Sequence, residues 1–158
     1  MVSQYQKSSD SEKKKRILPQ IVVLGSYIKR RKDLILCVDS TPTIPESKLT
    51  GALGESYRAL ALMNVSGRFL VDTGKEYQKG DILALAYDFF EDSLEVSLDS
   101  LMTVNVRVAS VNDKLRICIL ADGDGDFSAL RQKYPSVTVS EDADGTELLL
   151  LLEGGDPL

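Results

Sequence analysis

The stretch NVSGRFLVDTGKEYQKGDILALAYDF, residues 64–89, carries the pattern on which the predicted fold depends. A short polar turn opens it, and the alternating segment at residues 69–71 then favours a β-strand. A break at Gly74 and a polar turn at residues 79–81 lead into a second apolar segment at residues 82–87. This order predicts a β-hairpin, with residues 64–68 as a candidate ligand-binding loop at its entrance.

Short apolar segments recur along the rest of the chain, at intervals of about eight to twelve residues, which is typical of antiparallel barrels and sandwiches. Further strands are predicted at residues 17–24, 34–38, 57–65, 94–98, 102–111, 115–120, 137–139 and 147–152. Residues 39–54 contain two prolines and two glycines and are predicted to be a long loop with at most one helical turn. Residues 128–134 predict a short helix with Asp126 or Ser128 as N-cap and Pro135 after its end. The expected fold is therefore mainly β, a small antiparallel β-barrel with one short C-terminal helix and an extra hairpin.

The charge is unevenly distributed and suggests three regions. The net charge of −5 divides into +6 for residues 1–33, −4 for residues 34–120 and −7 for residues 121–158. We expect a disordered basic tail at 1–16, a barrel domain at 17–135 and an acidic C-terminal hairpin at 136–158. The five leucines at 148–152 are too uniform for a half-exposed strand, so we expect them to be buried against the barrel or in an oligomer interface.

Composition argues against catalysis and against metal binding. The chain has no histidine, which excludes Ser-His-Asp and Cys-His catalysis, and no spacing favours paired carboxylates or a lysine nucleophile. We therefore expect that the protein is not an enzyme. Cys37 and Cys118 lie in apolar segments and are expected to be buried, reduced thiols rather than zinc ligands. The acidic loop at residues 122–126 fails the EF-hand pattern at its sixth and twelfth positions, Phe127 and Lys133, and is expected to be a solvated turn.

Partners and compartment follow from the same composition. An acidic total charge makes a nucleic acid polymer an unsuitable partner. No apolar run is long enough to span a bilayer, and the polar N-terminus lacks the apolar core of a secretory signal. The expected compartment is the cytoplasm, with no membrane insertion.

Residues 57–134 resemble the PilZ domain, a small bacterial β-barrel whose typical members bind cyclic di-GMP. The resemblance is carried by residues 64–69 (NVSGRF) and 77–83 (YQKGDIL), followed by an acidic linker and two further strands. Two departures stand out: Phe69 takes the place of a motif glycine, and no Arg-x-x-x-Arg motif is present. The pattern is closest to degenerate PilZ proteins associated with type IV pili, which act through protein contacts. Residues 94–117 have a weaker similarity to the SpoA-type barrels of flagellar switches and type III secretion.

These resemblances imply a non-enzymatic bacterial signalling adaptor that acts through protein–protein contacts in motility, pilus or surface control. One alternative is a direct cyclic di-GMP effector, and a further one is a SpoA-like structural subunit of a flagellar switch or secretion complex. The adaptor needs no cofactor, whereas the effector would bind cyclic di-GMP. The expected partners are proteins of the pilus or motility machinery, with a homo-oligomer as an open alternative. If the nucleotide binds, the resemblance and the nearby basic residues assign it to Arg30, Arg31, Asn64, Ser66 and Arg68.

Overall fold

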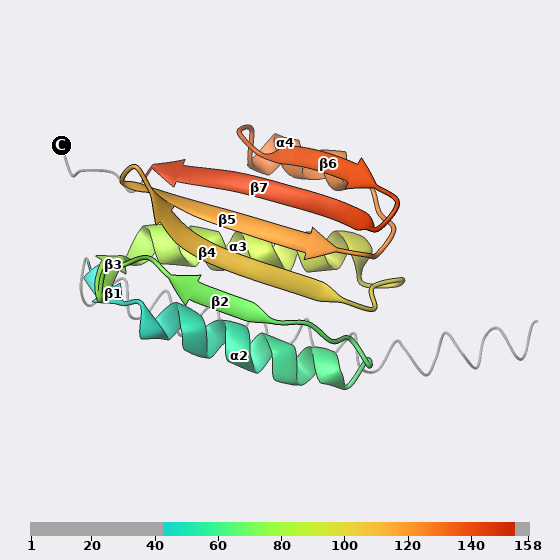
Figure 1. Cartoon of the computed structure of the whole chain (residues 1–158), viewed down its shortest axis with the longest axis horizontal. Helices are drawn as coiled ribbons and strands as arrows, with labels where there is room; N and C mark the ends of the chain where they lie inside the picture. Colours follow the sequence, from blue (N-terminus) through green and yellow to red (C-terminus); the bar gives the residue numbers. More distant parts are fainter. Residues whose placement is uncertain (1–42, 154–158) are drawn as a thin grey trace, which may run out of the picture.

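The computed structural model describes residues 43–153 as a mixed sheet with its helices on one side (Figure 1). The main sheet has five strands in the order β2-β4-β5-β7-β6, and a separate small sheet pairs β1 with β3. In chain order the elements are β1 (Thr43–Pro45), α2 (Ser47–Ala61), β2 (Phe69–Asp72), β3 (Tyr77–Lys79), α3 (Gly80–Ser97), β4 (Val104–Val111), β5 (Lys114–Ala121), the 3-10 turn η1 (Phe127–Ala129), α4 (Leu130–Lys133), β6 (Thr138–Asp142) and β7 (Gly145–Glu153).

The sheet combines one parallel pairing with three antiparallel ones. β2 runs parallel to β4, whereas β4–β5, β5–β7 and β7–β6 are antiparallel. Asn112 and Asp113 join β4 to β5 with φ angles of 51° and 65°, the left-handed conformation that a two-residue hairpin turn of type I′ requires. Asn and Asp tolerate this conformation better than most residues, so the local sequence specifies the turn.

The strands obey the period of two that their sequence predicts. In β4, Val104, Val106 and Val108 are buried, as expected from their alternation with polar residues. The leucine run follows the same rule in β7, since Leu148 and Leu150 are buried while Leu151 is 41% exposed. Burial of the whole run against the rest of this chain is therefore wrong, and the alternative, burial in an oligomer interface, stays a prediction. The predicted strands at 69–71, 102–111, 115–120, 137–139 and 147–152 and the short helix near 128–134 are confirmed, apart from small shifts of their ends.

The predicted strands at residues 82–87 and 94–98 are wrong, because both lie in the single helix α3. A continuous apolar run does not separate a buried strand from a buried helix by its period. Here the apolar residues continue at helical spacing, and Leu83, Tyr87, Phe90 and Leu94 are all buried.

The predicted loop at 39–54 and strand at 57–65 are also wrong where the structure describes them. They are replaced largely by α2, whose Leu49, Leu53, Ser56 and Leu60 recur at helical spacing and are buried. The two glycines of this segment argue against a helix when the sequence is considered alone, because glycine is a poor helix former. A Cβ atom added at Gly54 would lie 3.6 Å from the ring of Phe69 on β2, so this position contacts the sheet closely.

The expected mainly β, PilZ-like barrel is therefore wrong. The sheet is open, with β2 and β6 at its two edges, and two amphipathic helices rather than a closing strand cover its apolar face. β6 and β7 belong to the same sheet as β4 and β5. The proposed division at residues 16 and 135 stays a prediction, and the predicted strands at 17–24 and 34–38, with Cys37, lie outside the described residues. None of the helices within residues 43–153 has the length and apolar character needed to span a bilayer.

Candidate functional site

The predicted ligand loop at residues 64–68 connects α2 to β2 along the edge of the sheet. The Ser66 N–H donates a hydrogen bond of 3.0 Å to the Met102 carbonyl, and the Ser66 carbonyl accepts one of 2.9 Å from Val104. The side chains of Asn64, Ser66 and Arg68 are exposed, and Asn64 has a φ angle of 60°. The loop backbone thus continues the sheet pairing.

Close packing explains why residue 67 of this loop is a glycine. Gly67 has a φ angle of 147°, and an added Cβ atom would lie only 1.7 Å from the Val104 carbonyl oxygen. The Tyr57 hydroxyl donates hydrogen bonds of 2.6 Å to that oxygen and 3.1 Å to the Arg68 carbonyl. Burial raises the pKa of Tyr57 well above its ordinary value. This pattern fastens α2 to the edge of the sheet.

The nucleotide-binding role assigned to Asn64, Ser66 and Arg68 stays a prediction. Arg30 and Arg31, the other two residues of that assignment, lie outside the described residues.

Two acidic turns meet at one end of the sheet and enclose a hollow of about 460 Å³, here called the acidic hollow. One turn follows β5, and the other joins β6 to β7; they come together because Ala121 pairs with Thr146 across β5 and β7. The residues that line the acidic hollow are Asp122, Gly123, Asp124, Gly125, Glu141, Asp142, Ala143, Asp144, Gly145 and Thr146. Five of these residues are carboxylic acids and none is basic.

Two of the carboxylates hold the hollow together. Asp122 accepts two hydrogen bonds of 2.9 Å, from the backbone N–H groups of Met102 and Thr103 before β4. Asp142 accepts hydrogen bonds from the N–H groups of Asp144 and Gly145 and so shapes the β6–β7 turn.

The other three carboxylates are available to a ligand. Within residues 43–153, no hydrogen bond or ion pair engages the carboxylates of Asp124, Glu141 and Asp144. The hollow therefore combines carboxylates that hold it together with carboxylates that can bind.

The first turn lies directly on α3. A Cβ atom added at Gly123 would lie 2.8 Å from the Ser97 side chain, and one at Gly125 would lie 2.4 Å from the Val96 carbonyl oxygen. Only glycine allows so close an approach. The spacing Asp-Gly-Asp-Gly is thus a usable sequence signal for a backbone packed on a helix. The acidic side chains of this turn, Asp122, Asp124 and Asp126, are exposed, as expected for a solvated turn.

A further group of acidic side chains lies on α3, but protein groups bind it. Glu91 is buried and accepts hydrogen bonds of 2.7 Å from Ser56 on α2 and from Tyr87. Asp92 accepts a hydrogen bond of 2.6 Å from the Tyr134 hydroxyl and forms an ion pair of 2.9 Å with Lys133. These contacts join α3 to α2 and to the segment that follows the acidic hollow.

Neither the cysteine nor the carboxylates form a preassembled metal centre. Cys118 is half-buried on the outer face of the sheet, so the expectation of a buried thiol is wrong for this cysteine. Within residues 43–153, no three His, Cys, Asp or Glu side chains are placed so that they would hold a metal ion by themselves.

The fold of this chain is similar to solved structures of histidine kinases. The nucleotide-free catalytic domain of histidine kinase ThkA superimposes with a TM-score of 0.52 at 9% identity, covering 71% of this chain and 94% of that domain. ThkA in complex with the response regulator TrrA gives a TM-score of 0.53 at 8% identity, covering 98% of this chain and 63% of that one. Histidine kinase AdeS of Acinetobacter baumannii gives 0.51 at 10% identity, with coverages of 88% and 82%. No protein-family model and no curated protein sequence matches the chain. At these identities the likeness establishes the fold alone.

This likeness overturns the family assignment made from sequence. The chain has neither the PilZ nor the SpoA fold, and the predicted PilZ-type adaptor, with its cyclic di-GMP and SpoA alternatives, loses its structural basis. The expectation that the protein is not an enzyme is likewise contradicted, because the structures that share the fold are those of kinases. The absence of histidine excludes catalytic triads that contain histidine, but it does not exclude every kind of catalysis.

Proposed function

We propose that this chain is a nucleotide-binding signalling module with the histidine kinase catalytic-domain fold, and that the acidic hollow receives the nucleotide together with Mg²⁺. The observation that carries the proposal is the position of this hollow. It lies where a glycine-containing turn packs directly on α3 at the end of the sheet, in a fold shared with kinase catalytic domains.

The size and polarity of the acidic hollow suit a nucleoside. Its volume of about 460 Å³ lies within the range of small-molecule sites. The free carboxylates of Asp124, Glu141 and Asp144 can accept hydrogen bonds from an exocyclic amine of a purine or from ribose hydroxyls. These groups complement the hydrogen-bond donors of a nucleoside.

The charge of the acidic hollow requires a cation beside the phosphates. Two like unit charges about 6 Å apart repel by roughly 0.7 kcal/mol in water and by about 3 kcal/mol at an effective dielectric constant of 20. Because five carboxylates and no basic side chain line the hollow, a bare triphosphate would be repelled. Mg²⁺ is usually held by one or two carboxylates together with substrate phosphates, so it needs no complete cage of protein ligands. Asp124 is the residue that we expect to share it.

Titration calorimetry with ATP, in the presence of Mg²⁺ and then of EDTA, tests this proposal. We expect heat of binding with Mg²⁺ and none with EDTA. Asp124→Asn should weaken binding of Mg·ATP, because it replaces the carboxylate that we expect to share Mg²⁺ with an amide of nearly the same shape. Asp113→Asn is the matched control, since Asp113 lies in the β4–β5 turn at the opposite end of these strands and should leave affinity unchanged.

Two results would refute the proposal. One is the absence of any heat at millimolar Mg·ATP with folded protein. The other is equal weakening by Asp124→Asn and Asp113→Asn, which would place the nucleotide elsewhere.

A protein partner is the second part of the proposed function. ThkA has been solved in complex with a response regulator, and this supports a role for the present chain in contacts with another protein.

A further inference from the structure

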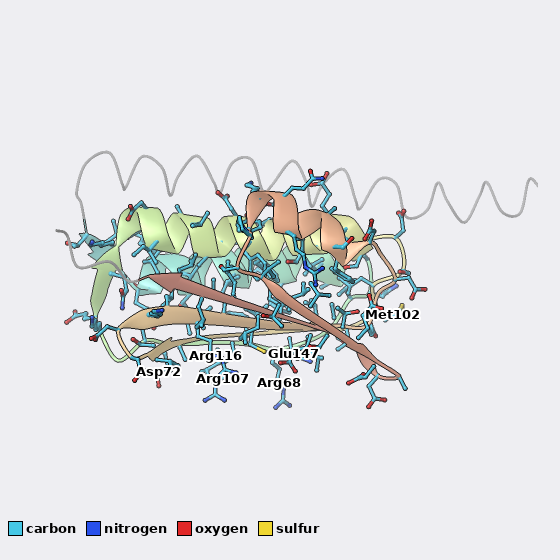
Figure 2. The ribbon with its side chains drawn as sticks, turned by 90° about the horizontal axis from the view of Figure 1, so that it is seen from above. Arg68, Asp72, Met102, Arg107, Arg116 and Glu147 are labelled. Atoms are coloured by element: carbon cyan, nitrogen blue, oxygen red, sulfur yellow. The ribbon has the colours of Figure 1, made fainter. Side chains whose placement is uncertain are left out.

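The outer face of the main sheet carries a diagonal of arginines. The helices cover the opposite face, and Figure 2 shows Arg68, Arg107 and Arg116 projecting away from them. Arg68 precedes β2 at the level of Asn105, Arg107 lies on β4, and Arg116 on β5 pairs with Ala109. Each step along the diagonal therefore moves one strand across and two residues along, which corresponds to about 8 Å. We call this surface the arginine face.

Apolar side chains flank the diagonal on both sides. Leu70 on β2 is 55% exposed, Leu120 on β5 is 42% exposed, and the half-buried Cys118 pairs with Arg107 between them. A shallow hollow of about 410 Å³ follows the first half of the diagonal. Its lining residues are Arg68, Phe69, Leu70, Asn105, Val106, Arg107, Cys118 and Leu120. The surface is thus a positive stripe bordered by leucines, and not a uniformly polar exterior.

The positive charge of the stripe is not neutralised locally. Within residues 43–153, none of the three guanidinium groups forms an ion pair. Two acidic residues of the same face lie off the diagonal: Asp72 lies on β2, and Glu147 lies on β7, one strand beyond Leu120. This arrangement leaves the centre of the face positive on a chain whose total charge is −5.

We propose that the arginine face binds an acidic amphipathic helix of another protein. Helices pack on sheet faces, as α2 and α3 do on the inner face of this sheet. A helix laid along the diagonal presents one carboxylate per turn at steps of about 5–6 Å, and the length of Arg and Glu side chains absorbs the difference from the arginine spacing. Its apolar residues then cover Leu70 and Leu120.

Charge disfavours three other occupants. A second copy related by a twofold axis would set the arginine diagonal against itself. The chain's own residues 1–33 carry a net charge of +6 and would be repelled. A nucleic acid polymer would meet three arginines on a protein that is otherwise acidic.

A synthetic probe tests the proposal without knowledge of the partner. The probe is a fluorescent helical peptide of about 20 residues, with Leu along one face and Glu beside it. A matched peptide carries Lys in place of Glu. We expect the full chain to bind the Glu peptide with an affinity that falls as salt rises, and not to bind the Lys peptide. Arg107→Glu and Arg116→Glu should each raise the dissociation constant about tenfold or more.

Two controls locate the bound peptide. Arg58→Glu makes the same change of charge at an exposed position on α2, and it should leave the affinity within about twofold. In a Cys37→Ser background, the Glu peptide should slow maleimide alkylation of Cys118, because that thiol lies beside Arg107 on the face. The Lys peptide should not slow it.

The proposal is overturned by any of four results. One is no binding of the Glu peptide by folded wild-type protein at high micromolar concentration. Another is an equal loss of affinity in Arg58→Glu and Arg107→Glu, which would indicate a nonspecific charge effect. The third is peptide binding that leaves the alkylation rate of Cys118 unchanged. Self-association that Arg107→Glu abolishes would equally overturn it, by assigning the face to a second copy.

Discussion

At the scale of single residues, Tyr57 illustrates how one polar group joins two layers. Its ring stacks on Phe69 and Phe90, with centroids 5.2 Å and 6.0 Å away, and its hydroxyl donates to the carbonyls of Arg68 and Val104. The aromatic contacts connect Tyr57 to β2 and α3, while its hydrogen bonds fix the backbone where β2 and β4 begin. Sequence alone placed this tyrosine in a strand.

The raised pKa of Tyr57 predicts a loss of stability at alkaline pH. The unfolded chain releases the tyrosine proton near the ordinary pKa of 10.0, whereas the folded protein keeps it to higher pH. The unfolded state is therefore favoured progressively as pH rises above about 10. Urea unfolding between neutral pH and pH 11 should show a steeper decline for wild type than for Tyr57→Phe. At neutral pH the same substitution should cost about 1 kcal/mol, because it removes the hydroxyl's hydrogen bonds. Parallel pH profiles for the two proteins would contradict this account.

At the scale of elements, glycines perform opposite roles in a helix and in a turn. Gly51 lies on the exposed side of α2, and no atom would lie within 4 Å of an added Cβ atom. Gly125, in the turn that lines the acidic hollow, has the Val96 carbonyl 2.4 Å from that position. The first glycine only weakens its helix, whereas the second is required for contact between the turn and α3.

This contrast predicts effects of opposite sign for one substitution. Gly51→Ala should raise the free energy of unfolding by about 0.5–1 kcal/mol, because alanine is the better helix former. Gly125→Ala should lower it by about 1–3 kcal/mol, since backbone must move to accept the methyl group. Thermal and urea unfolding of the two variants would measure both changes. If both glycines tolerated alanine equally, the close packing of the turn on α3 would be refuted.

At the scale of the whole molecule, β7 is a central strand although it comes last among the described elements. It lies between β5 and β6, with register pairs from Lys114↔Glu153 to Ala121↔Thr146. Its buried Leu148 and Leu150 belong to the same core as α3. The acidic hollow also depends on this strand, because β7 brings the β6–β7 turn beside the turn after β5.

Truncation after Pro135 should therefore prevent folding, and circular dichroism with amide-proton NMR would detect the loss. If residues 136–158 were only an appended hairpin, the truncated chain would keep a cooperative unfolding transition, and this result would contradict the prediction. Two single substitutions in β7 test the contribution of this strand to the core within the full chain. Leu148→Ala should cost about 2–5 kcal/mol because it opens a cavity in the core, whereas Leu151→Ala at the exposed position should cost far less.

The features that could be predicted from the sequence are those that depend on local chemistry. The alternation of Val104, Val106 and Val108 specified one face of β4, and Asn112-Asp113 specified its turn. Asp126 was expected as a possible N-cap, and its carboxylate accepts the Ser128 N–H. Each of these features depends only on residues a few positions away in the chain, so the local sequence pattern is enough to predict it.

Tertiary structure decided the identity of α2 and α3, the fold and the candidate site. An uninterrupted apolar run such as residues 82–87 satisfies a strand and a buried helix equally well, and only packing against α2 and the sheet selects the helix. The acidic hollow joins turns about twenty residues apart through the pairing of Ala121 with Thr146, and the arginine face depends on the register of three strands. Register and layer packing are set by contacts between distant segments, and these contacts leave no periodic trace in the sequence around Asp122 or Arg107.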